Sequence, residues 1–328
     1  MRTLEQREGR RWVIGAALVF VTAMLALPLF GPSALNLDRV LRRQAPDFGI
    51  LVQLRISRTL LALFAGGALS LGGTLFQAML RDALATPYTM GISTGAALGA
   101  VIVLTAGWQT LLGLPAIWIG SLIGAALVMF LVVGGSIDKR QLSAFNLLLT
   151  GIAVNSVCSA LIVLLHSLAG VSRSFSISRW LIGSVDSTSY PSLLTFITVI
   201  TVLSSIVILQ AKSWNLLAVG EQWAATRGVR VPRLMLSGYL CGSLLTAGTI
   251  ALTGPIGFVG LIIPHLVRSR VTSDHRVLMP CSFLLGGVLL ASCDSLGRVL
   301  LAPAEIPAGA IMAVIGGPYL VWLVRNQV

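Results

Sequence analysis

Long runs of apolar residues, separated by short polar or charged stretches, dominate the chain. A lipid hydrocarbon core about 30 Å thick requires about 20 apolar residues per helix, and several runs approach that length. The pattern predicts ten helices, at 12–30, 59–79, 91–107, 115–134, 144–168, 191–211, 233–252, 256–268, 278–296 and 309–324. The eighth is too short to cross the membrane completely. We therefore predict an all-α, polytopic membrane protein, with residues 1–328 forming a single transmembrane domain.

Composition supports this class. Of the 328 residues, 56% are hydrophobic and 10% are charged, whereas soluble domains carry about 25% charged residues. Four arginines precede the first apolar run, which is too long for a secretory signal and lacks its small-residue cleavage site. We expect that run to be a permanent membrane span.

The net charge of +12 would indicate nucleic-acid binding in a soluble protein, but the positive-inside rule produces the same excess in a membrane protein. With both termini cytoplasmic, 15 of the 23 basic residues lie inside: Arg2, Arg7, Arg10, Arg11, Arg81, Lys139, Arg140, Lys212, Arg227, Arg230, Arg233, Arg268, Arg270, Arg276 and Arg325. The other eight lie outside: Arg39, Arg42, Arg43, Arg55, Arg58, Arg173, Arg179 and Arg298. We predict this orientation.

Five of the eight outer arginines crowd between the first two predicted helices, where the positive-inside rule disfavours them. Charge alone leaves two explanations. The arginines either contact lipid headgroups from an interfacial loop or serve a function on that side.

Motifs of catalysis are missing from the sequence. The four cysteines, at 158, 241, 281 and 293, lie in apolar stretches without CxxC spacing, and the three histidines are scattered. No HExxH zinc motif and no GxxxxGK[ST] phosphate-binding loop occurs. We expect no enzyme activity, no metal site and no cofactor in this chain. Glycines at four-residue spacing, as in Gly91, Gly95 and Gly99, predict close helix packing.

Three polar features interrupt the apolar pattern. Residues 214–232 are too polar to span the membrane but keep helical apolar spacing, which is typical either of a short amphipathic helix bracketed by Gly220 and Gly228 that docks into a cytosolic partner or of an ordinary interfacial loop. In residues 253–280, Pro255 and Pro264 are predicted to break helices at both ends of a short apolar run. The third feature is a pair of charges four residues apart, Asp294 and Arg298, which we predict to pair on one helical face.

Several strings resemble the FecCD permease family, which includes the cobalamin, haem and iron-siderophore permeases of bacterial ABC importers. They are LRISRTLLALFAGGALSLGGTLFQ (54–77), RDALATPYTMGISTGAALGA (81–100), LLAVGEQWAATRGVRVPR (216–233), GPIGFVGLIIPHLVR (254–268), SDHRVLMP (273–280) and APAEIPAGAIMAVIGGPYLVWLVR (302–325). These strings occur in the family's order with the family's spacing, and the resemblance covers most of the chain.

The resemblance implies a type II ABC importer permease in the bacterial inner membrane. Its implied partners are a second permease copy or a paralogue, two cytosolic ATPase subunits that bind ATP-Mg, and a periplasmic or lipid-anchored substrate-binding protein; no nucleic acid is implied. The substrate-binding protein would dock on Arg55, Arg58 and Arg298. The ATPase would receive a coupling region at about 214–232, with Gly220, Glu221, Ala224, Arg227 and Gly228.

The resemblance also implies alternating access along a pathway lined largely by helices 144–168 and 309–324. An outer gate loop is expected at about 169–190, with Ser176, Ser178 and Ser184 as gate positions. A cytoplasmic motif comprises Pro264, His265 and Arg268.

The sequence departs from the family at three places. DALATP stands where the family commonly has NPLADP, and LRISR lacks the proline of the common LRLPR. In the coupling region, Trp223 replaces a small residue and Arg227 replaces a leucine, which is consistent with tuning toward a particular ATPase.

Iron-siderophore is the commonest substrate in the family, but cobalamin, haem and molybdate stay open, as does the choice between homodimer and heterodimer. A function of another class, an ion-coupled secondary transporter, would need buried carboxylates or histidines. The predicted spans offer few: Asp294 and His166 lie near helix ends. A membrane-embedded enzyme finds still less support, since no nucleophile–base arrangement is visible.

Overall fold

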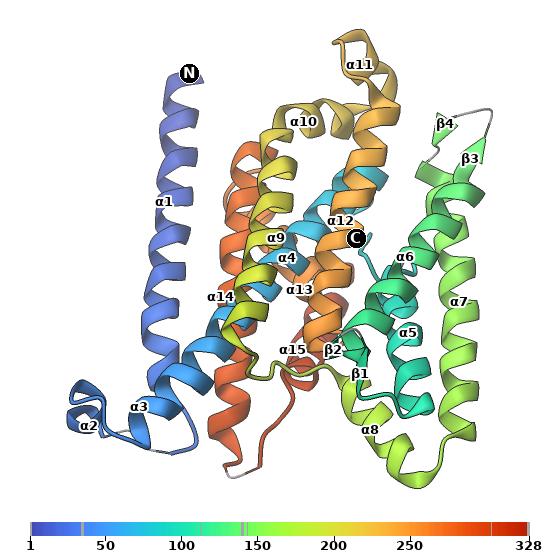
Figure 1. Ribbon diagram of the computed structural model, residues 1–328. Coiled ribbons are helices and arrows are strands. Elements are labelled where there is room, and N and C mark those ends of the chain that lie inside the picture. Colours follow the sequence, from blue (N-terminus) through green and yellow to red (C-terminus); the bar gives the residue numbers. More distant parts are fainter. Residues whose placement is uncertain are drawn as a thin grey trace.

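The computed structural model describes residues 2–33, 36–111, 113–138, 141–142, 144–302 and 304–326 and is built almost entirely of helices (Figure 1). All ten predicted helices are present: α1 (Arg2–Ala26), α4 (Ser57–Leu80), α5 (Ile92–Ala106), α6 (Ala116–Ser136), α7 (Ala144–Leu168), α9 (Tyr190–Leu209), α12 (Val231–Thr253), α13 (Val259–Arg270), α14 (His275–Leu300) and α15 (Ala308–Asn326). Seven helical segments among the described residues are long and apolar enough to cross a membrane unaided. Helix α13 has 12 residues and spans about 18 Å, so the prediction of a short eighth helix is confirmed.

Shorter elements connect these helices. A 3₁₀ turn (Leu27–Leu29), α2 (Leu37–Leu41), α3 (Asp47–Gly49) and a π-helical stretch (Ile50–Ile56) lie between α1 and α4. Helix α8 (Val171–Ile182) follows α7, and α10 (Ala211–Val219) and α11 (Glu221–Thr226) precede α12. Two small hairpins pair β1 (Thr110–Leu111) with β2 (Leu114–Pro115) and β3 (Ile137–Asp138) with β4 (Gln141–Leu142), with Thr110 opposite Pro115 and Ile137 opposite Leu142.

The bundle has two distinct ends. The start of α1, helices α10 and α11 and the β3–β4 hairpin lie at one end, here named the α11 end (Figure 1). Helices α2, α3 and α8 and the connection from α14 to α15 lie at the opposite end, named the α8 end. Helix α4 runs obliquely between the two. Of the basic residues predicted for the inner side, Lys139 and Arg140 lie outside the described residues.

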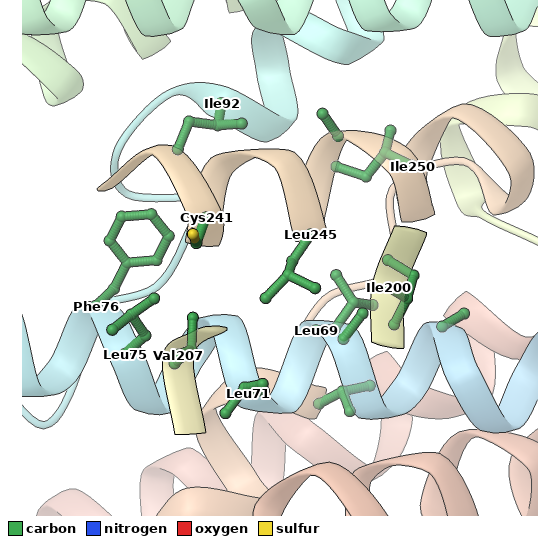
Figure 2. Packing of buried hydrophobic residues seen from close by; sticks show 14 of the residues in the cluster. Leu69, Leu71, Leu75, Phe76, Ile92, Ile200, Val207, Cys241, Leu245 and Ile250 are labelled. Atoms are coloured by element: carbon green, nitrogen blue, oxygen red, sulfur yellow. The ribbon is translucent and has the colours of Figure 1, made fainter. Parts of the chain in front are cut away.

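Helix α4 forms the centre of the core. In the most apolar stretch of the Asp47–Leu80 segment, which contains α4, 89% of the residues are buried. Side chains of α4, among them Leu75 and Phe76, pack toward Cys241 and Leu245 of α12, with Ile200 of α9 on the same side (Figure 2). Because lipid removes the hydrophobic drive between helices, dense packing of this kind holds the bundle together.

Glycine contacts draw the helices close, as the four-residue spacing predicted. A Cβ atom on Gly99 of α5 would overlap the carbonyl oxygen of Gly120 on α6. A Cβ atom on Gly66 of α4 would likewise overlap the carbonyl oxygen of Gly286 on α14. The glycines therefore serve helix packing at both contacts.

Pro264 does not break a helix, and that prediction is wrong. Pro264 lies inside α13, which continues to Arg270. A proline in a helix cannot bond the carbonyl four residues earlier, here that of Gly260. Instead, the Gln77 side chain of α4 donates to the Gly260 oxygen at 3.2 Å. The neighbouring helix thus satisfies the freed carbonyl.

The segment 169–190, expected as a loop, also differs from the prediction. Residues 171–182 form the helix α8, which buries Ile177 and exposes Val171 and Phe175. Gly183, with φ of +78°, ends the helix. Only residues 169–170 and 183–189 of this segment lie outside a helix, because α8 has enough apolar surface to pack against α5 and α7.

Candidate functional site

The three arginines predicted for docking come together at the α8 end. Arg55 lies in the π-helical stretch before α4, Arg58 in the first turn of α4 and Arg298 near the end of α14. They line one pocket of about 300 Å³, whose wall also includes Ser33, Ser187 and Glu305. The fold therefore gathers residues from four stretches of the chain: 32–33, 50–58, 187, and 298 with 305.

Arg55 is buried and held by backbone oxygens. Its guanidinium donates to the carbonyl of Leu29 at 3.2 Å and to that of Ser33 at 2.5 Å. Gly31 leaves room for it, because a Cβ atom there would overlap the guanidinium carbon. These bonds hold the segment after α1 against the start of α4.

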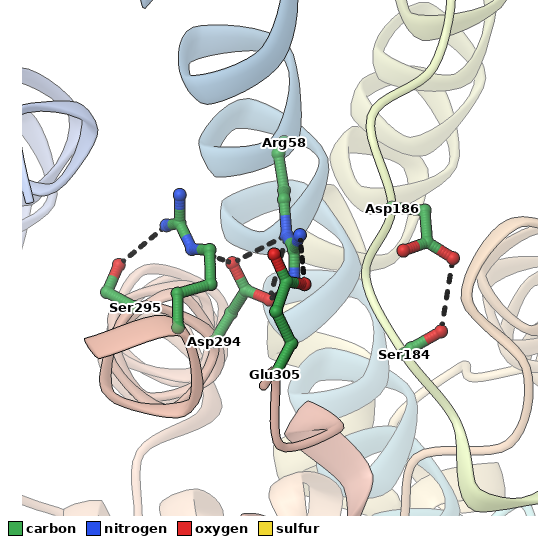
Figure 3. A network of polar contacts seen from close by, with 7 residues as sticks. Arg58, Ser184, Asp186, Asp294, Ser295 and Glu305 are labelled. Atoms are coloured by element: carbon green, nitrogen blue, oxygen red, sulfur yellow. Dashed lines mark hydrogen bonds and ion pairs between the residues drawn. The ribbon is translucent and has the colours of Figure 1, made fainter. Parts of the chain in front are cut away.

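Arg58 is shared between two carboxylates (Figure 3). Its Nη2 donates to Asp294 Oδ1 at 3.0 Å and its Nε to Asp294 Oδ2 at 3.2 Å, while Nη1 donates to Glu305 Oε2 at 2.8 Å. This fork geometry is the strongest arrangement for an arginine and a carboxylate. The link between Arg58 and Asp294 joins residues 236 positions apart.

Asp294 also pairs with Arg298, as the four-residue spacing predicted. Arg298 Nε lies 3.2 Å from Asp294 Oδ2, although the two atoms are not aligned for a hydrogen bond. Arg298 Nη2 donates to Ser295 at 3.0 Å. Asp294 and Arg298 are both almost fully buried. Together with Asp294, the pocket residues form a cluster of three guanidinium groups and two carboxylates, which leaves one net positive charge in the cluster.

Sequence reasoning missed Glu305 and the pairing of Arg58 with Asp294. Glu305 comes shortly after Arg298 in the sequence, and this closeness was a signal that Glu305 could join the arginines. Nothing in the sequence indicated that Arg58 would contact Asp294, because α4 and α14 are far apart in the chain and only helix packing brings them together.

At the α11 end, the chain forms the short helix predicted between Gly220 and Gly228. Helix α11 begins directly after Gly220 and is followed by Gly228, whose φ is +83°. Ala224 is fully buried and anchors the helix, whereas Trp223 and Arg227 are exposed. The Arg227 guanidinium carbon lies 4.7 Å from the Trp223 ring centroid, so these two departures from the family pattern form a cation–π pair.

Glu221, the first residue of α11, contacts Arg81 at the end of α4. Arg81 Nη2 lies 2.9 Å from Glu221 Oε1, and both side chains are about two-fifths exposed. Arg81 itself adopts a left-handed conformation with φ of +55°, which ends α4. The pair connects α11 to the central helix of the bundle.

A second polar contact ties α10 to α14. The Asn215 amide donates to Asp274 at 2.6 Å and accepts from the His275 backbone N–H at 2.8 Å. The same Asn215 oxygen lies 2.7 Å from His275 Nδ1. The sequence held no signal for this contact beyond the polarity of the two segments.

The three serines proposed for the gate all make contacts within the chain. Ser178 Oγ lies 2.9 Å from Nε2 of His166 at the end of α7, and Ser176 donates to the Ser172 carbonyl. Ser184 donates to Asp186 at 3.2 Å, apart from the arginine cluster (Figure 3). Each of the three serines thus contacts a different part of the chain.

The cytoplasmic motif lies on α13 and contacts α15. The ring centroid of His265 lies 6.2 Å from that of Tyr319 in an edge-to-face arrangement. Arg268, one turn later, is partly buried. Pro264, as described above, is accommodated inside the helix.

Within the described ranges, no group of three or more histidine, cysteine, aspartate or glutamate side chains is placed to hold a metal ion. The four cysteines are buried and unpaired there.

The FecCD transport family model matches residues 17–326. The chain belongs to this family. It is 35% identical to the hemin transport system permease protein HmuU of Yersinia pestis over 97% of this chain and 96% of that protein. It is also 33% identical to the vitamin B12 import system permease protein BtuC of Klebsiella pneumoniae, over 99% of this chain and 96% of the relative.

Solved structures agree with the family assignment. The FecCD-family chain superposes with a TM-score of 0.83 on a structure described as an inward-facing conformation of a putative metal-chelate type ABC transporter, with 31% identity over 97% of this chain and 99% of the other. PsaBC from Streptococcus pneumoniae matches with a TM-score of 0.56 and 15% identity over 87% of this chain and 92% of the other, and shows the fold alone. The predicted type II importer permease fold is confirmed.

Proposed function

We propose that this chain is the permease subunit of an ATP-driven importer that moves a metal chelate across the bacterial inner membrane. The observation that carries the proposal is the placement of two candidate protein-binding sites at opposite ends of one bundle. The arginine pocket lies at the α8 end and α11 lies at the α11 end, with α4 between them. A permease that receives its substrate on one side of the membrane and is driven by an ATPase on the other side requires this separation.

The substrate class follows from the relatives. Their names specify hemin, vitamin B12 and, for FecC of Escherichia coli, Fe(3+) dicitrate. All three are metal ions held by an organic ligand. An iron-siderophore complex is our first choice for this chain, with cobalamin and haem as alternatives.

The partners follow from the same family. We assign ATP hydrolysis to two separate ATPase subunits that receive α11, and docking of a substrate-binding protein to the pocket of Arg55, Arg58 and Arg298. A second permease copy or a paralogue completes the pathway. In this arrangement both termini are cytoplasmic and the α11 end faces the cytoplasm.

An ion-coupled transporter has less support from the described residues. Buried ionisable groups inside spans mark ion pathways, yet the buried ones among the described residues lie near the ends of the bundle. Arg55, Asp294 and Arg298 lie at the α8 end, as does Asp47, and His275 lies at the opposite end, where α14 begins. Asp294 and Arg298 compensate each other's charge.

Reconstitution tests the proposal. The chain is purified with the ATPase that co-purifies from native membranes and is placed in liposomes, with the cognate substrate-binding protein on the opposite side. We expect uptake of labelled ferric siderophore only when ATP and Mg²⁺ are supplied on the ATPase side. Parallel assays with cobalamin and haem decide the substrate. Uptake by the chain alone, driven by a proton or sodium gradient, would refute the proposal.

A further inference from the structure

The arginine pocket already contains the type of group that a docking protein would bring to it. Glu305 accepts the bond from Arg58 Nη1 at 2.8 Å, and the other two nitrogens of that guanidinium are bound to Asp294. A carboxylate arriving from outside therefore meets an arginine on which every nitrogen already donates to a carboxylate. It would also face the negative charge of Glu305 beside it.

The two carboxylates on Arg58 are held very differently. Asp294 is almost completely buried, bonds two nitrogens of Arg58 and pairs with Arg298. Among the described residues, Glu305 has one side-chain ion pair, with Arg58, and 46% of its side-chain surface is exposed. Removing Asp294 would leave buried charges without compensation, whereas Glu305 can turn into solvent and remain hydrated. Glu305 is thus the carboxylate that can leave.

The backbone around Glu305 favours such a movement of the side chain alone. The N–H of Ile306 donates to the carbonyl of Gly297 on α14 at 3.1 Å. Four residues after Glu305, the N–H of Gly309 donates to the Gly183 carbonyl at the end of α8 at 3.0 Å. The connection is therefore fixed to α14 and α8, and exchange at Arg58 requires rotation of only one side chain.

We propose that Glu305 is an internal competitor for Arg58, and that an Asp or Glu side chain of the docking protein replaces it when the complex forms. This inference rests on the proposed function. In the free permease, Glu305 lowers the affinity of the pocket for acidic partners and keeps Arg58 oriented on α4. In the complex, the incoming carboxylate takes the Nη1 position, and the positive charge left over in the pocket favours this exchange.

Binding measurements on three variants test the proposal. The complete permease–ATPase complex is embedded in lipid nanodiscs, and the probe is the fluorescently labelled substrate-binding protein that restores transport in the liposomes. The variants are Glu305→Gln, Arg58→Gln and the double variant. Asp38→Asn is the matched control, because Asp38 is exposed at the same end and lies outside the pocket.

We expect Glu305→Gln to tighten docking about two- to fivefold, the range that corresponds to loss of a partly exposed ion pair. Asp38→Asn should change the dissociation constant less. Arg58→Gln should weaken docking, and in that background Glu305→Gln should have no further effect, since the two residues act through one contact. Size-exclusion chromatography checks that each variant is folded, and Arg58→Lys replaces Arg58→Gln if the latter fails.

The outcomes separate the inference from the function on which it rests. Unchanged or weaker docking by Glu305→Gln, with Arg58→Gln still harmful, overturns the competitor role. If Asp38→Asn tightens docking as much as Glu305→Gln does, the competitor role is also overturned. Any loss of negative surface charge at this end would then have the same effect. If Arg58→Gln leaves docking unchanged, the pocket is not part of the docking site.

Discussion

Arg81 at the end of α4 and Glu221 at the start of α11 are joined by a 2.9 Å ion pair. Helix α4 thus has a charged contact at each end, because Arg58 in its first turn binds Asp294 and Glu305. A movement of α11 would reach the centre of the bundle through this pair.

The Arg81–Glu221 pair gives the first prediction. An ion pair with both side chains partly exposed contributes only about 0.2–1 kcal/mol, so Glu221→Gln should leave the fold and the assembly with the ATPase intact. We expect it to reduce the amount of substrate transported per ATP hydrolysed in liposomes. The swapped variant Arg81→Glu/Glu221→Arg should recover part of the loss. Full coupling in Glu221→Gln would exclude a role for the pair.

A second prediction concerns the contact between Gln77 and Gly260. Gln77→Leu leaves the Gly260 carbonyl without its partner, which costs about 1–3 kcal/mol for a buried group. We expect a lower midpoint of thermal unfolding in detergent. Pro264→Ala restores an N–H that can bond this carbonyl within α13. In the Pro264→Ala background, Gln77→Leu should lower the midpoint of thermal unfolding less. Equal losses in both backgrounds would show that Gln77 does not compensate for the proline.

The third prediction compares the two glycines around α11. Gly228 has φ of +83°, a conformation that is strained by about 1–3 kcal/mol for other residues. Gly220 has extended backbone, and no atom lies within 4 Å of the position of an added Cβ. Gly228→Ala should therefore speed hydrogen exchange of the α11 amides in the isolated permease, and Gly220→Ala should not. The same rate in both variants would contradict the role assigned to the turn at Gly228.

The fourth prediction concerns the buried carboxylate. Asp294→Asn removes the charge that compensates Arg58 and Arg298, of which Arg298 is almost fully buried. Breaking a buried ion pair in this way costs about 3–5 kcal/mol. We expect a large loss of thermal stability, while Glu305→Gln, at the exposed carboxylate, should have a small effect. Similar stabilities of the two variants would show that Asp294 is not the structural anchor of the pocket.

Much of the architecture could be predicted from the sequence. The apolar runs located all ten helices, the glycine spacing identified the packing contacts, and the four-residue spacing of Asp294 and Arg298 identified their pair. Two local predictions failed for related reasons. Pro264 stays helical because Gln77 of another helix bonds Gly260, and residues 171–182 form α8 because α5 and α7 offer a surface to cover Ile177. Gln77 and α5 are far in sequence from the elements that they contact, and only α7 is adjacent to α8.

The candidate sites divide in the same way. Local features, namely polarity and the two flanking glycines, predicted α11. The family resemblance pointed to Arg55, Arg58 and Arg298, but apart from the pairing of Arg298 with Asp294 their contacts were not predictable. Arg55 and Arg58 are bound by groups from separate segments of the chain, whereas Arg298 donates to Ser295 on its own helix.

The sequence alone determined that the chain resides in lipid and where its ten predicted helices lie, because a backbone in hydrocarbon must satisfy its own hydrogen bonds within each apolar run. The tertiary structure decided which charges meet. Those pairings join residues up to 247 positions apart, and they depend on the tilt and depth of packed helices, which no local pattern records.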